Sequence, residues 1–184
     1  MAKLVSNTYG EALFDLALEQ KALDDIYAQV LCARECMLDN QELLTLLSHP
    51  KISREEKIEV VENIFKGRVS DTLVGLLVTV VEKGRDGDIV AIFDYFIDRY
   101  KEYRKIGVLY VTSAFPLSDA KKTDIESKII SVTDYKELET YYTVDESIIG
   151  GLILRIKDRV VDSSIKSKLE KMEKTLNGVS VITN

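Results

Sequence analysis

Apolar residues in the first 105 positions recur every three or four residues, which is the spacing of one helix face. Polar or glycine-containing segments separate the runs and predict six helices. Ser6 or Asn7 is placed to cap the first helix, and Ser53 with Glu56 forms a capping box that opens the fourth. Six helices in about 105 residues predict a compact helical bundle.

Two of these helices carry a pronounced apolar surface. The fifth, roughly Ser70 to Lys83, is apolar almost all round, and such a helix is buried on most sides or waits for a partner. The first carries a stripe of small, aromatic and aliphatic residues: Tyr9, Ala12, Leu13 and Leu16. A groove between these helices can accept an amphipathic helix of another chain, although burial in the core is the commoner fate of such stripes.

After Gly107 the apolar period changes from 3.6 to 2, which predicts strands. The expected order is a strand at 108–112, a helix at 118–131, strands at 138–144 and 152–156, a hairpin return through 160–161, and a closing helix from about Ser164 that stops at Asn177-Gly178. The fold class is therefore α+β, with a six-helix bundle at 1–105 and a β-α-β-β-α domain at 106–184.

Composition narrows the classes of function. Of the 184 residues, 46% are apolar and the net charge is −6 without a block of like charge, so a packed core is expected and bulk nucleic-acid binding is not. The chain shows no signal-peptide pattern and no apolar stretch of the about 20 residues that cross a bilayer. Cys32 and Cys36 are spaced like reduced, buried thiols of a reducing compartment.

Candidate catalytic and metal-binding residues are few, and each has a simpler interpretation. His49 has no recognisable nucleophile beside it, and with Cys32 and Cys36 it gives only three soft ligands where structural zinc wants four. Gly150-Gly151 lacks the further glycines of a phosphate-binding loop and fits a tight entry into a strand. The sequence therefore predicts no metal, no cofactor and no catalytic residue.

Two polar clusters near the end of the chain are also better explained by structure. Asp162-Ser163-Ser164 pairs a hydroxyl with a carboxylate, but it directly precedes a helix and fits an N-cap. Asp145-Glu146-Ser147 is expected to be a loop rather than an acid/base pair.

The succession of motifs resembles the delta subunit of F-type ATP synthases, whose mitochondrial counterpart is the oligomycin-sensitivity-conferring protein. The resemblance covers nearly the whole chain through Tyr9-Gly10-Glu11-Ala12-Leu13-Phe14 with Ala17, Pro50-Lys51-Ile52 with Lys57, Lys83-Gly84-Arg85, Ser113-Ala114-Phe115-Pro116-Leu117-Ser118, Val144-Asp145-Glu146-Ser147-Ile148-Ile149-Gly150-Gly151, Val160-Val161-Asp162-Ser163-Ser164 and Lys168-Leu169. Three positions depart from the family pattern. Gly10 replaces the usual Ala, Lys157 a frequent Gly, and Ser163 the Gly of Asp-Gly-Ser.

The resemblance implies a non-catalytic stator protein, present once per complex, in the peripheral stalk of a rotary ATP synthase. The bundle would bind the N-terminal helix of an alpha subunit between the first and fifth helices. The C-terminal domain would bind the C-terminal end of the b subunit. By position, the alpha contact falls on Tyr9, Ala12, Leu13, Leu16, Leu76, Leu77 and Val80, and the b contact on Gly150, Gly151, Ile165 and Leu169.

The resemblance also implies a location, and two functions of other classes remain as alternatives to it. The protein would lie on the cytoplasmic side of a bacterial plasma membrane, or less expectedly on the stromal side of a thylakoid. An alternative function is a free-standing helical adaptor that captures an amphipathic helix of an unrelated partner. A third is a small hydrolase that uses Asp162 and Ser164.

Overall fold

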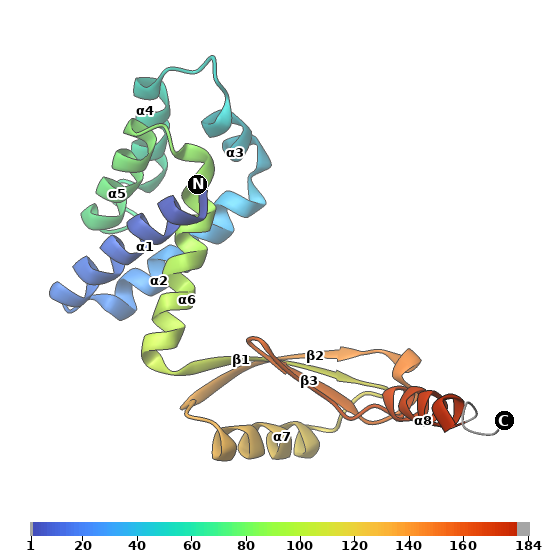
Figure 1. Ribbon diagram of the computed structural model, residues 1–184. Coiled ribbons are helices and arrows are strands. Elements are labelled where there is room, and N and C mark those ends of the chain that lie inside the picture. Colours follow the sequence, from blue (N-terminus) through green and yellow to red (C-terminus); the bar gives the residue numbers. More distant parts are fainter. Residues whose placement is uncertain (1, 180–184) are drawn as a thin grey trace. The chain divides into compact units, whose positions relative to one another are not determined.

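The structure, a computed structural model, describes residues 2–179 and divides after Lys101 into two compact units. Within the described residues it contains eight α-helices and one four-stranded mixed sheet (Figure 1). The division falls inside helix α6, a few residues before the change of apolar period. None of the described helices has both the length and the apolar character needed to cross a membrane.

The first unit is helical. Its elements are α1 (Ala2–Glu19), α2 (Leu23–Asp39), α3 (Gln41–Ser48), α4 (Arg54–Phe65), α5 (Asp71–Glu82), a 3₁₀ turn η1 (Asp86–Asp88) and most of α6 (Ile89–Arg104). Helix α6 buries one apolar face with the spacing of a helix: Ile89, Ile92, Phe93, Phe96, Ile97 and Tyr100. Phe96 meets Phe14 of α1 edge to face, with ring centroids 6.2 Å apart.

One predicted helix start is confirmed and the other is wrong. Ser53 Oγ accepts the Glu56 amide at 3.2 Å, and Glu56 Oε2 accepts the Ser53 amide at 3.0 Å, which completes the capping box. The cap expected at Ser6 or Asn7 does not exist, because α1 already begins at Ala2 and Ser6 lies within it, 6% exposed. Alanine and lysine are strong helix formers, so the helix extends through the preceding turn.

A nearly buried ion pair fixes the turn between α5 and α6. Lys57 Nζ of α4 lies 2.8 Å from Asp86 Oδ2 of η1, and the two side chains are only 9% and 13% exposed. Arg54 donates to the Glu82 carbonyl at 3.2 Å, so α4 holds both sides of the same turn. The end of α5 is thereby tied to α4 through polar contacts as well as through the core.

The second unit contains the sheet. Its elements are β1 (Ile106–Ser113), α7 (Asp119–Val132), β2 (Glu137–Val144), η2 (Glu146–Ile148), β3 (Leu152–Ile156), β4 (Arg159–Asp162) and α8 (Ile165–Val179). The strand order is β2-β1-β3-β4, with β1 and β2 parallel and the other pairs antiparallel. Helix α7 covers one face, where Tyr142 of β2 donates to Glu126 at 3.0 Å (Figure 1).

Strand β1 lies inside the sheet, between β2 and β3, and its side chains alternate between the two faces. Leu109 and Val111 are at most 1% exposed on the face toward α7. On the opposite face Tyr110 stacks on Tyr141 at 5.3 Å, and the Arg155 guanidinium lies 5.8 Å from the Tyr110 ring. The sheet therefore has one apolar face and one aromatic, partly exposed face.

The predicted end of the last helix is wrong. Helix α8 continues through Asn177 and Gly178 to Val179, where the described residues end. Glycine within a helix costs only about 1 kcal/mol, so an Asn-Gly pair does not by itself terminate one.

We expect Lys57→Met to lower the free energy of unfolding by about 3 kcal/mol, because it leaves the Asp86 carboxylate nearly buried without its cation. Chemical denaturation followed by circular dichroism measures the change. Lys66→Met is the control, since Lys66 and Glu62 form a solvent-exposed ion pair at 4.0 Å. Loss of this pair should change the free energy of unfolding by less than about 0.5 kcal/mol. Equal effects of the two substitutions would contradict a special role for the Lys57–Asp86 pair.

Candidate functional site

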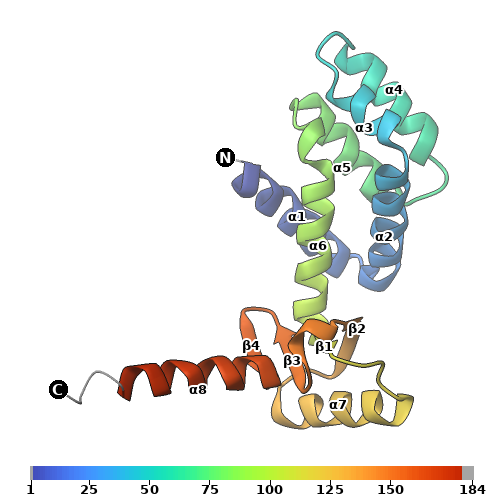
Figure 2. The same ribbon diagram turned by 90° about the vertical axis from the view of Figure 1, so that its right-hand side faces the viewer.

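The surface expected to bind a partner helix in the first unit is built from α1 and α5, which pack against each other. A cross-link joins the end of α1 to the start of α5, since Thr72 Oγ1 donates to Gln20 Oε1 at 3.1 Å. Figure 2 shows the helices of this unit around the long α6. We call the exposed and half-buried residues of α1 and α5 around Ala12, Leu16 and Leu76 the α1–α5 surface.

The seven residues predicted for this contact differ in how far they are buried. Ala12 and Leu16 are exposed, Leu16 by 43%, while Tyr9 and Leu76 are half-buried. The other three are at most 1% exposed and belong to the core: Leu13, Leu77 and Val80. Four of the seven side chains can therefore touch a partner, and three support them from beneath.

Gly75 belongs to this surface and was missed by the sequence reasoning. It is exposed in the middle of α5, and a Cβ added there would meet no atom within 4 Å. A glycine inside a helix costs about 1 kcal/mol relative to alanine, and here no neighbour within the described chain requires it. The available signal was this single glycine in a run of leucine and valine, since a bare helix backbone permits close approach from outside.

A polar cluster holds α1 against α6. Tyr95 Oη donates to Glu11 Oε2 at 2.8 Å, and Arg99 Nε lies 3.2 Å from both Glu11 oxygens. The Tyr95 ring fills the space beside Gly10, where an added Cβ would lie 2.4 Å from Tyr95 Cδ1. The departure from the family pattern at Gly10 is therefore matched by an aromatic ring on α6.

In the second unit, the predicted Gly150 and Gly151 form the socket for the start of α8. The loop turns through positive φ at Ile149 (+67°) and Gly151 (+82°). A Cβ on Gly151 would lie 2.4 Å from the Ser163 carbonyl oxygen, and one on Gly150 would lie 2.7 Å from Ile165 Cδ1. The Ile165 amide donates to the Gly150 carbonyl at 2.9 Å. At Gly151 the neighbouring atoms are backbone and φ is positive, so only glycine fits there, whereas a side chain at position 150 would require the end of the Ile165 side chain to move.

The polar cluster before α8 is a helix cap. Asp162 Oδ1 accepts the Ser164 amide at 2.8 Å, Asp162 Oδ2 accepts the Ser167 hydroxyl, and Ser164 Oγ accepts the Ser167 amide at 3.1 Å. Hydrogen bonds from Ser167 and then from Ser164 lower the pKa of Asp162 to about 2. Both side chains that a hydrolase would use are thus engaged by the first turn of the helix.

Beyond its first turn α8 exposes an apolar stripe with the spacing of one helix face. Its exposed fractions increase along the helix, from Ile165 (42%) through Leu169 (52%) and Met172 (63%) to Leu176 (69%). Within the unit α8 packs mainly against η2. An isolated helix of about 15 residues is marginal in water, so this stripe favours a partner. We call these four residues the α8 stripe.

The remaining candidates behave as ordinary surface residues. His49 is exposed, and its Nδ1 accepts the Lys51 amide at 3.2 Å. The expected burial of the cysteines is wrong, because Cys32 is exposed and Cys36 is half-exposed on the side of α2 that the core does not use. Among the described residues no three His, Cys, Asp or Glu side chains converge on a metal position.

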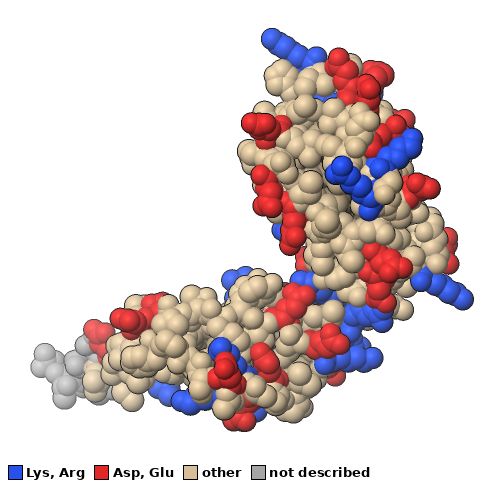
Figure 3. All heavy atoms as spheres, turned by 180° about the vertical axis from the view of Figure 1, so that it is seen from behind, with Lys and Arg blue, Asp and Glu red and all other residues tan. Residues whose placement is uncertain are grey.

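On the face seen in Figure 3, acidic and basic side chains are interspersed and form no patch of one charge that could bind a charged ligand. Asp145 is a turn residue, whose carboxylate accepts the Ser147 amide at 2.9 Å, and hydrogen bonding to Ser147 lowers its pKa. Burial, followed by the Glu126 carboxylate, raises the pKa of Tyr142 to about 12. These shifts come from local structure at surface positions.

The chain is similar to known proteins over almost its full length. The family model described as ATP synthase delta (OSCP) subunit matches residues 5–176. The chain is 54% identical over 176 residues to ATP synthase subunit delta of Lachnoclostridium phytofermentans, covering 96% of this chain and 97% of that protein. The corresponding protein of Halalkalibacterium halodurans is 36% identical over 172 residues, with 94% of each chain covered.

A solved structure has the same fold. A chain in the cryo-EM structure of the Toxoplasma gondii mitochondrial ATP synthase hexamer superposes with a TM-score of 0.72 at 18% identity, covering 93% of this chain and 96% of that one. The α+β fold is therefore shared across very different sequences.

The Asp162 cap makes the start of α8 sensitive to acid. Because the pKa of Asp162 is lowered from 3.8 to about 2 by folding, the carboxylate stabilises the cap above about pH 4 and loses this effect as the pH falls toward 2. We expect the protection factors of the Ser164 and Ser167 amides, which are exchange rates corrected for the intrinsic effect of pH, to fall over that range. In Asp162→Ala, which removes the acceptor, the protection factors should already be low at pH 5 and should not depend on pH; a profile equal to that of the unaltered chain would contradict the assignment.

Proposed function

Because this chain belongs to the ATP synthase delta (OSCP) family, whose members are non-catalytic components of the peripheral stalk of F-type ATP synthases, we propose that it joins the catalytic head to the stalk through two separate surfaces. The first is the α1–α5 surface and the second is the α8 stripe with its Gly150-Gly151 socket. The observation that carries the proposal is that each unit exposes an organised apolar helix surface that it does not bury itself.

The α1–α5 surface is proposed to bind the N-terminal helix of an alpha subunit. Ala12 and the exposed Gly75 leave room for a helix to approach, while Leu16 and Leu76 offer apolar contact. Such a helix would lay its apolar face on this surface. Leu13, Leu77 and Val80 in the core keep the surface in shape. Little ordering entropy is then lost on binding, which raises affinity for a given buried area.

The α8 stripe is proposed to bind the C-terminal part of the b subunit. Its residues are spaced by four, three and four positions, which is the seam of a helix that packs against another helix. The capped turn, Gly150 and Gly151 fix the position of the first turn of α8 within the unit, and so fix where the stripe begins. Ile165 and Leu169 are the stripe residues nearest to this first turn.

This arrangement suits a mechanical role. A stator must hold the head against torque, and burial of apolar surface at about 25 cal/mol per Å² gives a contact that needs no chemistry. The proposal includes a six-helix bundle as the head-binding part, one copy of the chain per complex, and a place on the cytoplasmic side of a bacterial membrane. The competing proposal, a free-standing adaptor for an unrelated amphipathic helix, would use the same α1–α5 surface.

Ala12→Arg tests the head contact, because it places a charged side chain on an exposed position of the α1–α5 surface without touching the core. We expect binding of a peptide with the sequence of the N-terminal helix of the alpha chain to weaken by about tenfold or more in titration calorimetry of the full-length protein. Helix content by circular dichroism should not change.

Ala28→Arg is the matched control, since Ala28 is likewise exposed but lies on α2. It should bind the peptide as the unaltered chain does. Equal affinity of all three proteins would contradict the head contact. An unaltered chain that binds an unrelated amphipathic helix as tightly as the alpha peptide would favour the adaptor.

Leu169→Gln tests the stalk contact by removing one apolar side chain from the middle of the α8 stripe, where it is 52% exposed and glutamine is well tolerated in a helix. We expect affinity for a fragment from the carboxyl-terminal part of the b subunit to fall by about tenfold. Lys174→Gln, on the opposite side of α8, should leave it unchanged. Loss of affinity in both variants, or in neither, would contradict docking through the stripe.

A further inference from the structure

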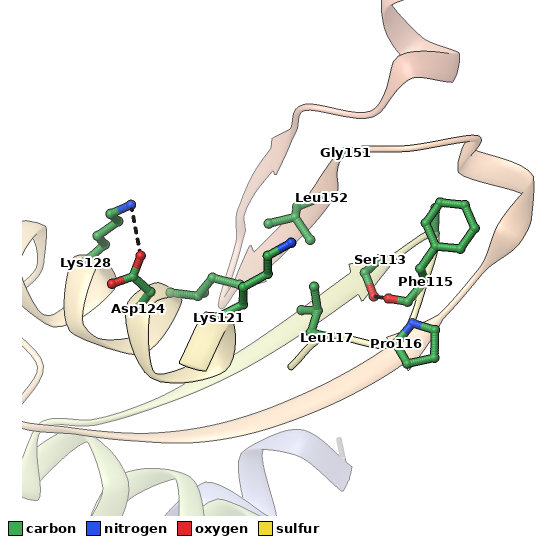
Figure 4. A pocket seen from close by; sticks show the side chains of 11 residues that line it. Ser113, Phe115, Pro116, Leu117, Lys121, Asp124, Lys128, Gly151 and Leu152 are labelled. Atoms are coloured by element: carbon green, nitrogen blue, oxygen red, sulfur yellow. Dashed lines mark hydrogen bonds and ion pairs between the residues drawn. The ribbon is translucent and has the colours of Figure 1, made fainter. Parts of the chain in front are cut away.

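The second unit contains a cavity of about 410 Å³ that the proposed head and stalk interfaces do not use. It lies between the segment that follows β1, the first half of α7 and the start of β3 (Figure 4). Its volume is within the range of small-ligand sites, about 300 to 1,000 Å³. We call it the α7 cavity.

The walls of the α7 cavity are mostly apolar: Ala114, Phe115, Pro116, Leu117, Ile125 and Leu152. Ala114 forms a buried floor at 3% exposure, whereas the Phe115 ring is 68% exposed at the edge. Ser113 is also present, but its hydroxyl donates to the Phe115 carbonyl at 2.7 Å and so shapes the loop. An aromatic ring left largely in water beside an apolar hollow favours an apolar ligand.

The charged side chains of the α7 cavity leave one cation without a partner. Lys128 Nζ lies 3.6 Å from Asp124 Oδ2, so these two charges compensate each other. Within the part of the chain that the structure describes, the Lys121 ammonium has neither an ion pair nor a hydrogen bond. Figure 4 shows it reaching from α7 toward Leu117 and Leu152, whereas Lys128 turns to Asp124. The lining therefore carries a net charge of +1 inside a chain of net charge −6.

We propose that the α7 cavity binds an apolar group that ends in a carboxylate, with the hydrocarbon part against Phe115, Leu117 and Leu152 and the carboxylate on Lys121. Only one cation is available, so a multiply charged anion such as phosphate is poorly matched. Such a carboxylate exists on medium-chain fatty acids and at the carboxyl terminus of a polypeptide with an apolar last residue. The proposal is independent of the head and stalk interfaces, which a negative result would leave as they are.

Methyl NMR of the full chain tests the proposal with three probes: octanoate, its neutral analogue octanamide, and acetyl-Leu-Leu with a free carboxyl group. We expect octanoate, acetyl-Leu-Leu or both to shift the Leu117, Ile125 and Leu152 methyls saturably, and octanamide to bind about fivefold more weakly than octanoate. A response to octanoate alone identifies the ligand as a fatty acid. A response to the peptide alone identifies it as the carboxyl terminus of a polypeptide. No saturable shift with either acid would overturn the proposal.

Lys121→Met should weaken binding of the responding acid about fivefold, with the methyl spectrum of the free protein retained because Lys121 is exposed. Lys122→Met is the matched control. It removes the same charge from the next residue, whose ammonium is 2.9 Å from Asp119 and does not line the cavity. Equal losses in the two variants, or octanamide affinity equal to that of octanoate, would show that Lys121 does not bind a carboxylate and would overturn the proposal.

Discussion

Among the described residues, helix α8 is anchored to its unit mainly at its first turn, and this constraint explains much of the local sequence. The Asp162 cap satisfies the first amides, the Gly151 backbone lies against the Ser163 carbonyl, and Ile165 covers Gly150. Beyond that turn the helix has apolar residues whose exposure rises from 42% to 69%. The first turn of α8 is thus firmly anchored, whereas the rest of the helix is little buried, and such a helix favours packing against a partner chain.

In the first unit, buried side chains support an exposed helix surface from beneath. Its core extends beneath the α1–α5 surface through Leu13, Leu77 and Val80, so the exposed Ala12 and Leu16 are carried by a rigid support. Several polar side-chain contacts of the unit hold its helices in place: Lys57 with Asp86 at a turn, Thr72 with Gln20 between helices, and Tyr95 with Glu11.

The sequence predicted the elements well where one periodicity dominates. The buried face of α6 and the alternation of β1 followed directly from the spacing of their apolar residues. Prediction was weaker wherever two tendencies compete. Ser6 has the chemistry of a cap but lies inside α1, and Asn177-Gly178 has the pattern of a stop but remains helical. The burial of the site residues could not be predicted from the sequence. A helical pattern gives the angular position of Ala12 or Leu13 on the helix but does not say which neighbour covers it.

The Lys121 side chain of the α7 cavity was also not predictable, because its surroundings depend on contacts between separate segments, which no local pattern records.

Gly10 and Tyr95 show how the packing between α1 and α6 makes two positions depend on each other. The ring occupies the place of a Cβ at position 10, and its hydroxyl is held by Glu11, so the ring cannot move aside without giving up that bond. The two positions are therefore coupled in packing. Alanine at position 10 fits only beside a smaller or displaced side chain at position 95, and a smaller side chain at position 95 beside glycine leaves a cavity. Each single substitution is therefore expected to lower the free energy of unfolding, and the two effects should not simply add.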